Sequence, residues 1–351
     1  MSSKKVVNIA VVGLNSFGTF HIKGIHTLDC AKLVTVCDID KDILEKRAEE
    51  YGVAKENCYT DHKEMLKRED IDAVIVATPD PVHRLITVDA LKAGKHVLCE
   101  KPMAMRLSDC KEMVHTAEET GRKLMVGQVC RHYPSFIEAK AMVDDGLIGE
   151  LFYVESEYAH DYSGIAGIGG WRMDPVELRQ PVTGGGCHAI DLLRWIAGNP
   201  TEVFAYSNRK VLTNWPVDDC TVSVMKFPND VIGKVTTSIG CKRAYTMRTV
   251  LWGSEGTIIV DNRSTHMTLY KNDFNGEIKF RDQHIQGIPI MIPVTIKDHN
   301  VASEIHDLCM AILNDTPVSP DGREGASTVA VCSAIVESAA TGEKVIVDYE
   351  F

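Results

Sequence analysis

The sequence predicts an α/β protein of two domains, a doubly wound parallel sheet followed by an α/β domain with an open, mostly antiparallel sheet. From residue 6 to 128, short β-branched runs alternate with longer amphipathic stretches, which is typical of repeated βαβ units. From 202 to 281 the chain is mostly strand-like, with turn residues between the runs, which favours hairpin connections. Since 351 residues are enough for two domains, we expect one over residues 1–128 and a second over 129–351.

The strands expected in the first domain lie at residues 6–12, 32–37, 73–78, 95–99 and 123–127. The first, third and fifth carry almost no polar residue, as expected of central parallel strands covered on both faces. Helical patterns at 41–51 and 83–93 end at Gly52 and Gly94, and glycine commonly follows the last turn of a helix. A sheet of this kind binds its ligand at the carboxyl ends of the strands.

The second domain has a different pattern of expected helices and strands. A helix is expected near 134–145, a strand near 150–158 and a second helix at 188–197, with a glycine-rich stretch from Gly164 to Gly186 before it. Turn signals follow at 228–230, 253–256 and 275–276, and helical patterns at 299–313 and 324–341 close the chain.

Composition excludes several classes of protein. With 49 acidic and 38 basic residues the net charge is −11, and no basic run is present, so nucleic acid is not an expected partner. No uncharged apolar stretch approaches the roughly 18 residues of a membrane helix, so a membrane is not expected either. Eleven cysteines without a C-x-x-C pair favour reduced thiols and a cytoplasmic location.

A glycine-bearing loop directly follows the first expected strand and opens a helix: Gly13-Leu14-Asn15-Ser16-Phe17-Gly18. It resembles the dinucleotide-binding pattern G-x-G-x-x-G, in which the glycines make a tight turn and let the backbone approach the pyrophosphate. Asn15 replaces the second glycine, and asparagine tolerates left-handed backbone angles better than most residues. The alternative is a plain strand-to-helix turn.

Asp38 ends the second strand about 20 residues after Gly18, where a carboxylate would bind the adenosine ribose hydroxyls and repel a 2′-phosphate. This context favours a Rossmann domain that binds NAD in preference to NADP, although Lys41 and Lys46 lie nearby.

Two further turns lie at the ends of expected strands. One contains Thr78, Pro79 and His83, and the other is Glu100-Lys101-Pro102. A lysine and a glutamate at this position point into the crevice where a nicotinamide would lie. The alternative for Lys101 is an ordinary surface lysine.

His188 follows three glycines at the start of an expected helix, and Asp191 lies on the same face one turn later. A histidine titrates near working pH and can take the proton from an alcohol as a hydride leaves its carbon. The alternative is a helix-terminal histidine with a structural hydrogen bond. No metal is expected, because His-x-x-Asp offers two ligands and no third residue is spaced to join them.

The chain resembles the Gfo/Idh/MocA oxidoreductases, the family of glucose-fructose oxidoreductase and inositol dehydrogenase, over nearly its whole length. The resemblance rests on the loop of residues 13–18, Asp38, residues 78–83, Glu100-Lys101-Pro102, Gly127-Gln128, Arg131, Trp171-Arg172, residues 187–191 and residues 336–342.

The resemblance implies an N-terminal Rossmann domain and a C-terminal α/β domain whose open sheet builds homodimers or homotetramers. It makes Lys101 the residue that holds the reacting hydroxyl, with Glu100 orienting it and His188 as the acid/base. It places Gln128 near the nicotinamide. Residues implied to bind substrate are Arg131, Tyr158, Arg172, His188 and Asp191.

One departure from the family pattern affects the site. Many members carry an aspartate four residues before the histidine, and this chain has Gly184 there. His160, Asp161 and Asp174 are candidates to compensate, and we include His160 among the expected substrate-binding residues. The same change weakens an assignment as an inositol dehydrogenase.

These observations favour an NAD-dependent oxidoreductase that oxidises a secondary hydroxyl of an unphosphorylated sugar, glycoside or cyclitol. A second hypothesis is an enzyme that cleaves glycosides or catalyses an elimination, with an NAD that is recycled internally. A third is a catalytically inactive NAD-binding sensor. The sequence identifies neither the sugar nor the carbon that is oxidised.

Overall fold

A computed structural model describes residues 5–271, 289–296 and 299–351. The chain divides into two compact units. The first unit comprises the residues up to Val129, Asn300–Val329 and Tyr349–Phe351, and the second comprises Cys130–His299 and Ala330–Asp348. The residues after His299 are thus shared between both units, while the domain boundary at residue 128 stays a prediction.

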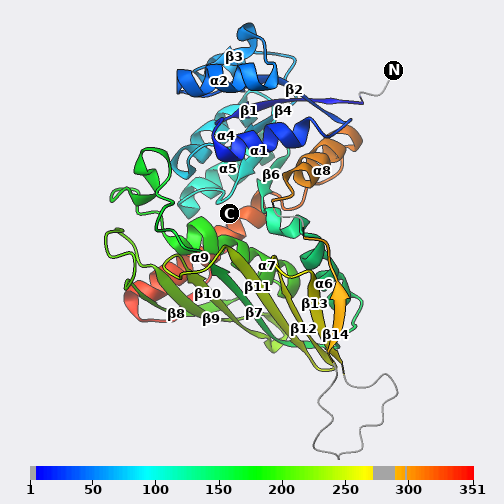
Figure 1. The fold of residues 1–351 in the computed structure, drawn as a ribbon, viewed down its shortest axis with the longest axis vertical. Coiled ribbons are helices and arrows are strands. Elements are labelled where there is room, and N and C mark those ends of the chain that lie inside the picture. Colours follow the sequence, from blue (N-terminus) through cyan, green and yellow to red (C-terminus); the bar gives the residue numbers. More distant parts are fainter. Residues whose placement is uncertain (1–4, 272–288, 297–298) are drawn as a thin grey trace, which may run out of the picture. The chain divides into compact units, whose positions relative to one another are not determined.

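The first unit is built on a six-stranded, entirely parallel sheet of order β3-β2-β1-β4-β5-β6 (Figure 1). This order reverses direction between β1 and β4, which is the topological switch point of a Rossmann sheet. All five predicted strands are confirmed. The strands are β1 Val7–Val12, β2 Ala31–Cys37, β3 Cys58–Tyr59, β4 Ala73–Val76, β5 His96–Glu100 and β6 Leu124–Gly127.

Alternate residues of the central strands enter two separate hydrophobic cores, one on each face of this sheet. In β1, Val7, Ile9 and Val11 belong to one core, and Ala10 and Val12 belong to the other. Side chains that alternate between two faces need apolar residues at every position, which explains the continuous apolar run in the sequence.

Helices cover both faces of the sheet, and the predicted helices at 41–51, 83–93 and 299–313 are confirmed. Asp40 caps the N-terminus of α2 and left-handed Gly52 ends it. The helices of this unit are α1 Ser16–Ile25, α2 Lys41–Tyr51, α3 His62–Leu66, α4 His83–Lys92, α5 Leu107–Thr120 and α8 Val301–Asn314, and α9 Gly322–Thr341 begins in it.

The second unit contains a nine-stranded sheet of order β14-β13-β12-β11-β7-β10-β9-β8-β15. Only the β7–β10 pair of this sheet is parallel, so the expected mostly antiparallel sheet is confirmed. Its strands are β7 Leu151–Ala159, β8 Glu202–Asn208, β9 Cys220–Lys226, β10 Ile232–Ser238, β11 Thr246–Gly253, β12 Gly256–Asp261, β13 His266–Lys271, β14 Ile290–Pro293 and β15 Val345–Ile346.

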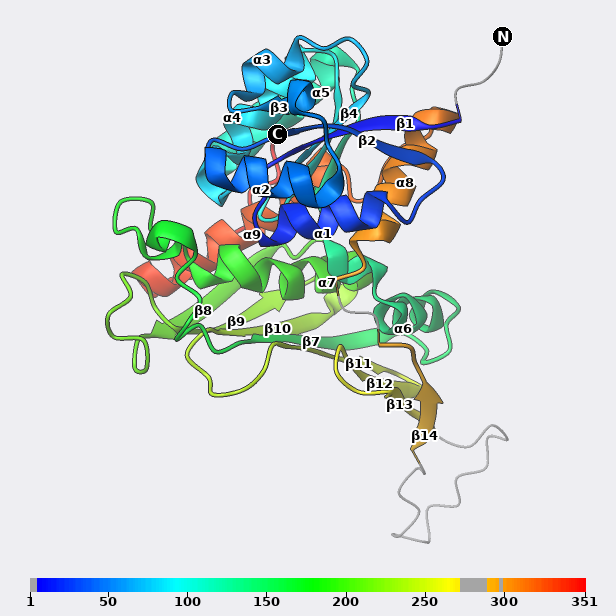
Figure 2. The same ribbon diagram turned by 45° about the horizontal axis from the view of Figure 1, so that its top comes forward.

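Two helices of this unit, α6 Pro134–Asp144 and α7 Cys187–Ala197, lie on one face of the sheet, and Figure 2 shows no helix of the unit on the other face within the described residues. The predicted turns at 228–230 and 253–256 are confirmed, whereas the turn at Asn275-Gly276 lies outside the described residues. The glycine-rich stretch contains a 3-10 segment at Ile168–Met173 and a π turn at Val182–Gly186.

None of the helices within the described ranges is long and apolar enough to cross a membrane. All eleven cysteines lie in the described ranges, and none of them forms a disulfide bond.

Candidate functional site

The loop after β1 has the geometry that the glycine pattern predicts. Gly13 has φ +88°, and a Cβ atom there would lie 2.6 Å from the carbonyl oxygen of Ala77 after β4. A Cβ on Gly18 would lie 1.8 Å from the carbonyl oxygen of Gly13. Asn15 is extended at φ −76°, so the loop does not use the left-handed angles that asparagine tolerates. The first glycine, Gly13, makes the tight turn, and α1 begins after Asn15 at Ser16.

Asp38 lies beside this loop at the carboxyl end of β2. One carboxylate oxygen accepts the backbone N–H of Leu14 at 2.8 Å, and the other accepts that of Asp40 at 3.0 Å. The next residue, Ile39, is 89% exposed. Sequence reasoning missed Ile39, although a single apolar side chain directly after Asp38 was visible in the sequence.

His83 joins the loops that follow β4 and β5. It is buried, and its Nδ1 and Nε2 each lie 2.9 Å from a backbone carbonyl oxygen, that of Pro102 and that of Thr78. Burial disfavours the charged ring, but Cys99, Asp80 and the Pro102 carbonyl outweigh it and raise the pKa of His83 to about 10. Two carbonyl acceptors require two N–H donors, so the geometry also favours the doubly protonated ring. A direct contact of His83 or Pro79 with a cofactor stays a prediction.

Glu100 is the last residue of β5, and its side chain is buried against α1. Its Oε1 lies 2.8 Å from His21 Nε2, and its Oε2 accepts the backbone N–H of Lys101 at 3.1 Å. Although burial acts in the opposite direction, His21 and the charge of Lys101 hold the pKa of Glu100 below its usual range. The Lys101 ammonium lies 6.0 Å from the centre of the Phe17 ring, so the lysine is at the same sheet edge as the glycine loop.

A second buried carboxyl group, Glu304 on α8, lies within electrostatic reach of this pair. It is 0% exposed, and neither of its side-chain oxygens has a hydrogen-bond partner among the described residues. Burial, reinforced by Glu100 and Asp307, raises the pKa of Glu304 well above its usual range. The two glutamates are therefore pushed apart in pKa: the surroundings favour the ionised form of Glu100 and the neutral form of Glu304. No motif or spacing in the sequence pointed to His21 or Glu304.

The carboxyl edge of the sheet fits an NAD molecule. Thr78 Oγ1 and Gln128 Oε1, after β4 and β6, are buried and have no hydrogen-bond partner among the described residues. Gly13 and Gly18 permit a close approach of the backbone, and Asp38 offers a carboxylate for a ribose. The residues that would hold the cofactor therefore follow β1, β2, β4 and β6, at the carboxyl ends of strands of one sheet.

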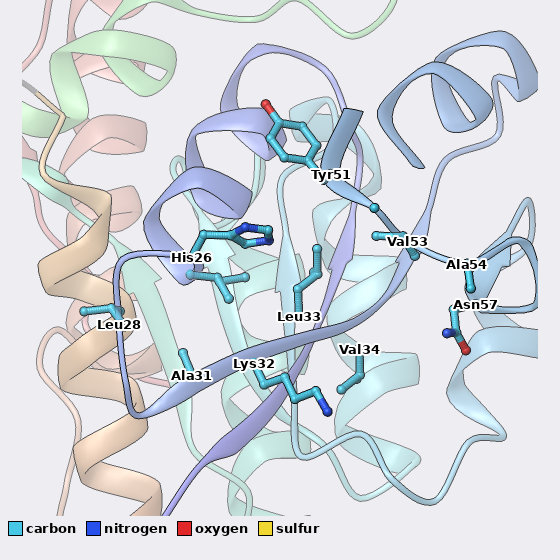
Figure 3. Close-up of a pocket in the computed structure, with 12 residues that line it drawn as sticks. His26, Leu28, Ala31, Lys32, Leu33, Val34, Tyr51, Val53, Ala54 and Asn57 are labelled. Carbon is cyan, nitrogen blue, oxygen red and sulfur yellow. The ribbon is translucent and has the colours of Figure 1, made fainter. Parts of the chain in front are cut away.

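A hollow in the first unit lies at the other end of β2. Its lining includes Ala31, Lys32, Leu33 and Val34 from the start of the strand (Figure 3). Ligands of such sheets bind beyond the carboxyl ends, where Asp38 lies, so we assign no ligand to this hollow.

In the second unit, Arg131 and Asp191 pair with each other. Arg131 donates from Nε and Nη2 to the two carboxylate oxygens of Asp191 at 2.7 and 2.8 Å, and both side chains are buried. Arg194 Nη1 lies 3.6 Å from the same carboxylate. This bidentate pair ties the turn after β6 to α7, and a role of either residue in binding substrate stays a prediction.

His188 is the second residue of α7 and is buried. Three side chains pack against the glycines of the π turn that precedes His188. Cβ atoms at Gly184, Gly185 and Gly186 would lie 2.0 Å from Arg179 Nη1, 2.4 Å from Tyr158 Cζ and 2.3 Å from Thr237 Oγ1. The glycines therefore let the chain before His188 approach these side chains closely.

An aromatic cluster lies around Tyr158 on β7. Its hydroxyl is 2.8 Å from that of Tyr162, and the rings of His160 and Tyr245 lie 6.3 and 5.6 Å from its own. Burial and Tyr162 raise the pKa of Tyr158 well above its usual range, so it is a neutral hydrogen-bonding group. Arg172 lies over the Tyr162 ring at 6.0 Å, so the structure brings Tyr158, His160 and Arg172 together.

The guanidinium group of Arg179 fills the space beside Gly184, and no carboxylate was found there among the described residues. Arg179 donates from Nη2 to the carbonyl oxygen of Gly184 at 2.9 Å in a buried contact. Asp161 instead contacts Lys242 at 3.2 Å, and Asp174 accepts the backbone N–H of Val176 at 2.8 Å. Sequence reasoning missed Arg179, because nothing in the spacing from Arg179 to Gly184 indicates this contact.

In the part of the chain that the structure describes, no three His, Cys, Asp or Glu residues group as a metal site.

Two protein families match successive parts of the chain. The family described as "Oxidoreductase family, NAD-binding Rossmann fold" matches residues 7–128, and the family described as "GFO/IDH/MocA C-terminal domain" matches residues 136–259. The two matches follow the order of the two sheets along the chain.

Individual relatives agree with this. Inositol 2-dehydrogenase 2 of Saccharopolyspora erythraea is 30% identical over 271 residues, 76% of either chain. Myo-inositol 2-dehydrogenase of Thermotoga maritima is 28% identical over 275 residues, 75% of this chain and 78% of that protein. A glycosyl hydrolase family 109 protein of Shewanella woodyi is 30% identical over 180 residues, only 49% of this chain and 37% of that protein.

A solved structure of levoglucosan dehydrogenase in complex with NADH has the same fold, with a TM-score of 0.87 at 22% identity over 97% of this chain and 99% of that one. The chain therefore belongs to the Gfo/Idh/MocA family of oxidoreductases, whose first domain is an NAD-binding Rossmann fold.

Proposed function

We propose that this protein is an NAD-dependent dehydrogenase that oxidises a secondary hydroxyl group of a sugar, glycoside or cyclitol. The observation that carries the proposal is the placement of Lys101 directly after β5, at the edge of the Rossmann sheet with the cofactor-binding features. Relatives named as inositol dehydrogenases support this class of substrate. When bound, NAD supplies the hydride acceptor.

In this proposal Lys101 holds the reacting hydroxyl group. Its ammonium stabilises negative charge that develops on the oxygen as the proton leaves. Glu100 orients Lys101, because its carboxylate is anchored by His21 and accepts the lysine's own backbone N–H. Glu100 is thus a positioning residue.

His188 takes the proton from the hydroxyl group. The ring nitrogen of a neutral imidazole can accept this proton. The proposal assigns Lys101 and His188 to the same reaction. Arg131, Tyr158, His160, Arg172 and Asp191 are proposed to line the substrate site.

The preference for NAD over NADP is also proposed. Asp38 repels a 2′-phosphate, and Ile39 offers an apolar surface to the adenine where a basic residue would favour the phosphate. Asn15, Ser16 and Phe17 would lie beside the pyrophosphate at the start of α1.

The test is absorbance at 340 nm with purified protein, NAD or NADP, and a panel of sugars, glycosides, sugar acids and inositols. A rise with NAD and one class of polyol supports the proposal. Lys101→Ala and His188→Ala should each lower kcat by about 100-fold or more. NAD binding, measured by fluorescence, should remain.

Lys92→Ala is the matched control, because Lys92 is exposed at the end of α4. A Lys101→Ala variant that turns over like Lys92→Ala would overturn the assignment of Lys101. A protein that binds NAD but changes no substrate of the panel would favour the sensor hypothesis.

A second candidate function is glycoside cleavage or elimination with an internally recycled NAD. The observation in its favour is the relative named as a glycosyl hydrolase family 109 protein. Product analysis distinguishes the two functions, since cleavage would release an aglycone or an unsaturated sugar without accumulation of NADH.

We further propose that the protein forms a homodimer or homotetramer through the uncovered face of the nine-stranded sheet. Val222 and Val224 on β9 and Tyr206 on β8 are exposed there, and Tyr206 pairs with Val222. Apolar side chains that project from a sheet without a covering helix are typical of an interface. The cytoplasmic location expected from the cysteines stays a prediction.

A further inference from the structure

Glu304 places a carboxyl group on the apolar face of α8. Val301, Ile305 and Leu308 share this buried face, and the last two belong to the hydrophobic core on that side of the Rossmann sheet. Glu304 is 0% exposed, and its two carboxyl oxygens make no hydrogen bond in the part of the chain that the structure describes. A buried carboxyl group of this kind costs stability, and a leucine would serve the packing better. The position therefore points to a role of the carboxyl group itself.

The strand β5 brings Glu100 to the same side of the sheet. Leu98 belongs to the same core as Ile305 of α8. Since alternate residues of a strand point to the same face, Glu100 projects from the end of β5 toward the layer that contains α8. The residues that β1, β2 and β6 contribute to this core are apolar.

The helix α1 connects the two glutamates. It packs against α8, since a Cβ atom on Gly24 would lie 3.1 Å from Ile305 Cδ1. One turn earlier in α1, His21 Nε2 lies 2.8 Å from Glu100 Oε1. Glu304 and Glu100 are thus held by neighbouring elements at the carboxyl edge of the sheet, where the cofactor-binding features lie.

Glu304 responds to the charges at this edge. Burial raises its pKa most, Glu100 and Asp307 raise it further, and Lys101 lowers it. Glu304 also lies in the first turn of α8, where the helix dipole favours the ionised form of an acid. A positive charge added at this edge would therefore favour loss of its proton, and removal of that charge would favour its return.

The cofactor brings such a charge. The nicotinamide ring of NAD⁺ is a cation, whereas the ring of NADH is neutral. Both forms would bind beyond the carboxyl ends of the strands, where β5 ends at Glu100. Oxidation and reduction of the cofactor therefore change the charge near a buried group that can titrate.

We propose that Glu304 couples a proton to the oxidation state of the cofactor. Its carboxyl group loses a proton to water when NAD⁺ binds, and it takes one up from water after the ring has accepted a hydride. The overall oxidation still releases one proton, which comes from the hydroxyl group of the substrate. This inference rests on the proposed place of NAD at the sheet edge, and it is independent of which substrate is oxidised.

The test measures the Kd values of NAD⁺ and NADH for the full-length protein by fluorescence titration between pH 5 and 9, without substrate. The ratio of the Kd for NAD⁺ to that for NADH should fall by about 10-fold as the pH rises, because the ionised carboxylate favours the cationic ring. In Glu304→Gln, which cannot ionise, this fall should be lost. Glu337→Gln, on an exposed part of α9, is the matched control and should behave as the wild type.

A second measurement follows the proton directly. The protein is mixed with NAD⁺ or NADH in weakly buffered solution with a pH indicator dye. NAD⁺ should release more protons than NADH in the wild type, and this difference should be lost in Glu304→Gln. Melting temperatures show whether the variant is folded, and if it is not, Glu304→Leu, which completes the apolar face of α8, takes its place in both measurements.

The proposal is overturned if the Kd ratio depends on pH equally in the wild type and in the Glu304 variant, or if NAD⁺ and NADH release equal numbers of protons from the wild type. Proton release that requires Glu304, without turnover of any compound in the substrate panel, would leave this inference standing and refute the proposed dehydrogenase instead.

Discussion

Asp191 accepts two hydrogen bonds from Arg131 and lies 3.6 Å from Arg194, while only 1% of its side chain is exposed. The single carboxylate of Asp191 thus faces two guanidinium groups inside the second unit. Its removal leaves buried positive charge without compensation, which is much more costly than the loss of an ion pair at the surface.

We therefore expect Asp191→Ala to lower the free energy of unfolding by about 3–5 kcal/mol, measured by urea denaturation. The matched comparison is Glu64→Ala, which removes the exposed partner of Lys67 and should cost about 0–1 kcal/mol. Equal losses in the two variants would show that the Arg131–Asp191 pair does not stabilise the unit.

Asp38 leads to a prediction about the cofactor. Asp38→Asn removes the charge that we propose binds the ribose hydroxyls and repels a 2′-phosphate, so the Kd for NAD should rise about 10-fold and the preference over NADP should shrink by at least as much. Fluorescence titration with both cofactors measures this. Asp42→Asn, in the exposed first turn of α2, is the control. An unchanged ratio of the two Kd values would contradict the role of Asp38.

At the scale of elements, α8 buries a carboxyl group, that of Glu304, in the Rossmann unit and thereby raises its pKa. Glu304 is far from β5 in sequence, yet it acts electrostatically on Glu100 at the strand's end. Because its pKa is higher in the folded than in the unfolded chain, its contribution to stability is complete below about pH 4.3. That contribution is lost as the pH rises through the folded pKa.

Glu304→Gln keeps the shape of the neutral acid and cannot ionise. We expect the free energy of unfolding of the wild type to fall relative to that of Glu304→Gln as the pH rises from 5 to 9. Denaturation curves across this range test it, with Glu337→Gln, on an exposed part of α9, as the control. Parallel pH profiles for the wild type and Glu304→Gln would contradict a protonated Glu304.

At the scale of the whole molecule, the uncovered sheet face leads to a prediction about assembly. Val224 is 51% exposed in the middle of β9, opposite Phe204 and Lys234 on the neighbouring strands. Val224→Asp should convert the proposed oligomer to a monomer, because a buried carboxylate at the interface would be unpaired. Light scattering after size exclusion measures the mass.

Ile137→Asp is the control for this prediction, since Ile137 is exposed on α6, on the other side of the sheet. A wild-type protein that is already a monomer, or a Val224→Asp variant that keeps the oligomer mass, would contradict assembly through β9.

The local sequence determined the Rossmann sheet, because each of its features depends on neighbouring residues. Apolar runs bounded by turn residues define β1 and β4, and a glycine is required wherever the backbone turns sharply, as at Gly13. Asp38, Glu100 and Lys101 could be predicted for the same reason, since the end of a parallel strand is a local feature with a known place in the sheet.

The tertiary structure decided which side chains meet. Arg131 and Asp191 are 60 residues apart, and their charges pair only because the turn after β6 packs against α7. The pKa of Glu304 is raised because α8 buries it, which no local pattern encodes. Arg179 takes the place beside Gly184 because the irregular backbone between β7 and α7 folds back on itself. Charge pairing and burial depend on distances in space, and for these residues those distances are set by packing rather than by spacing along the chain.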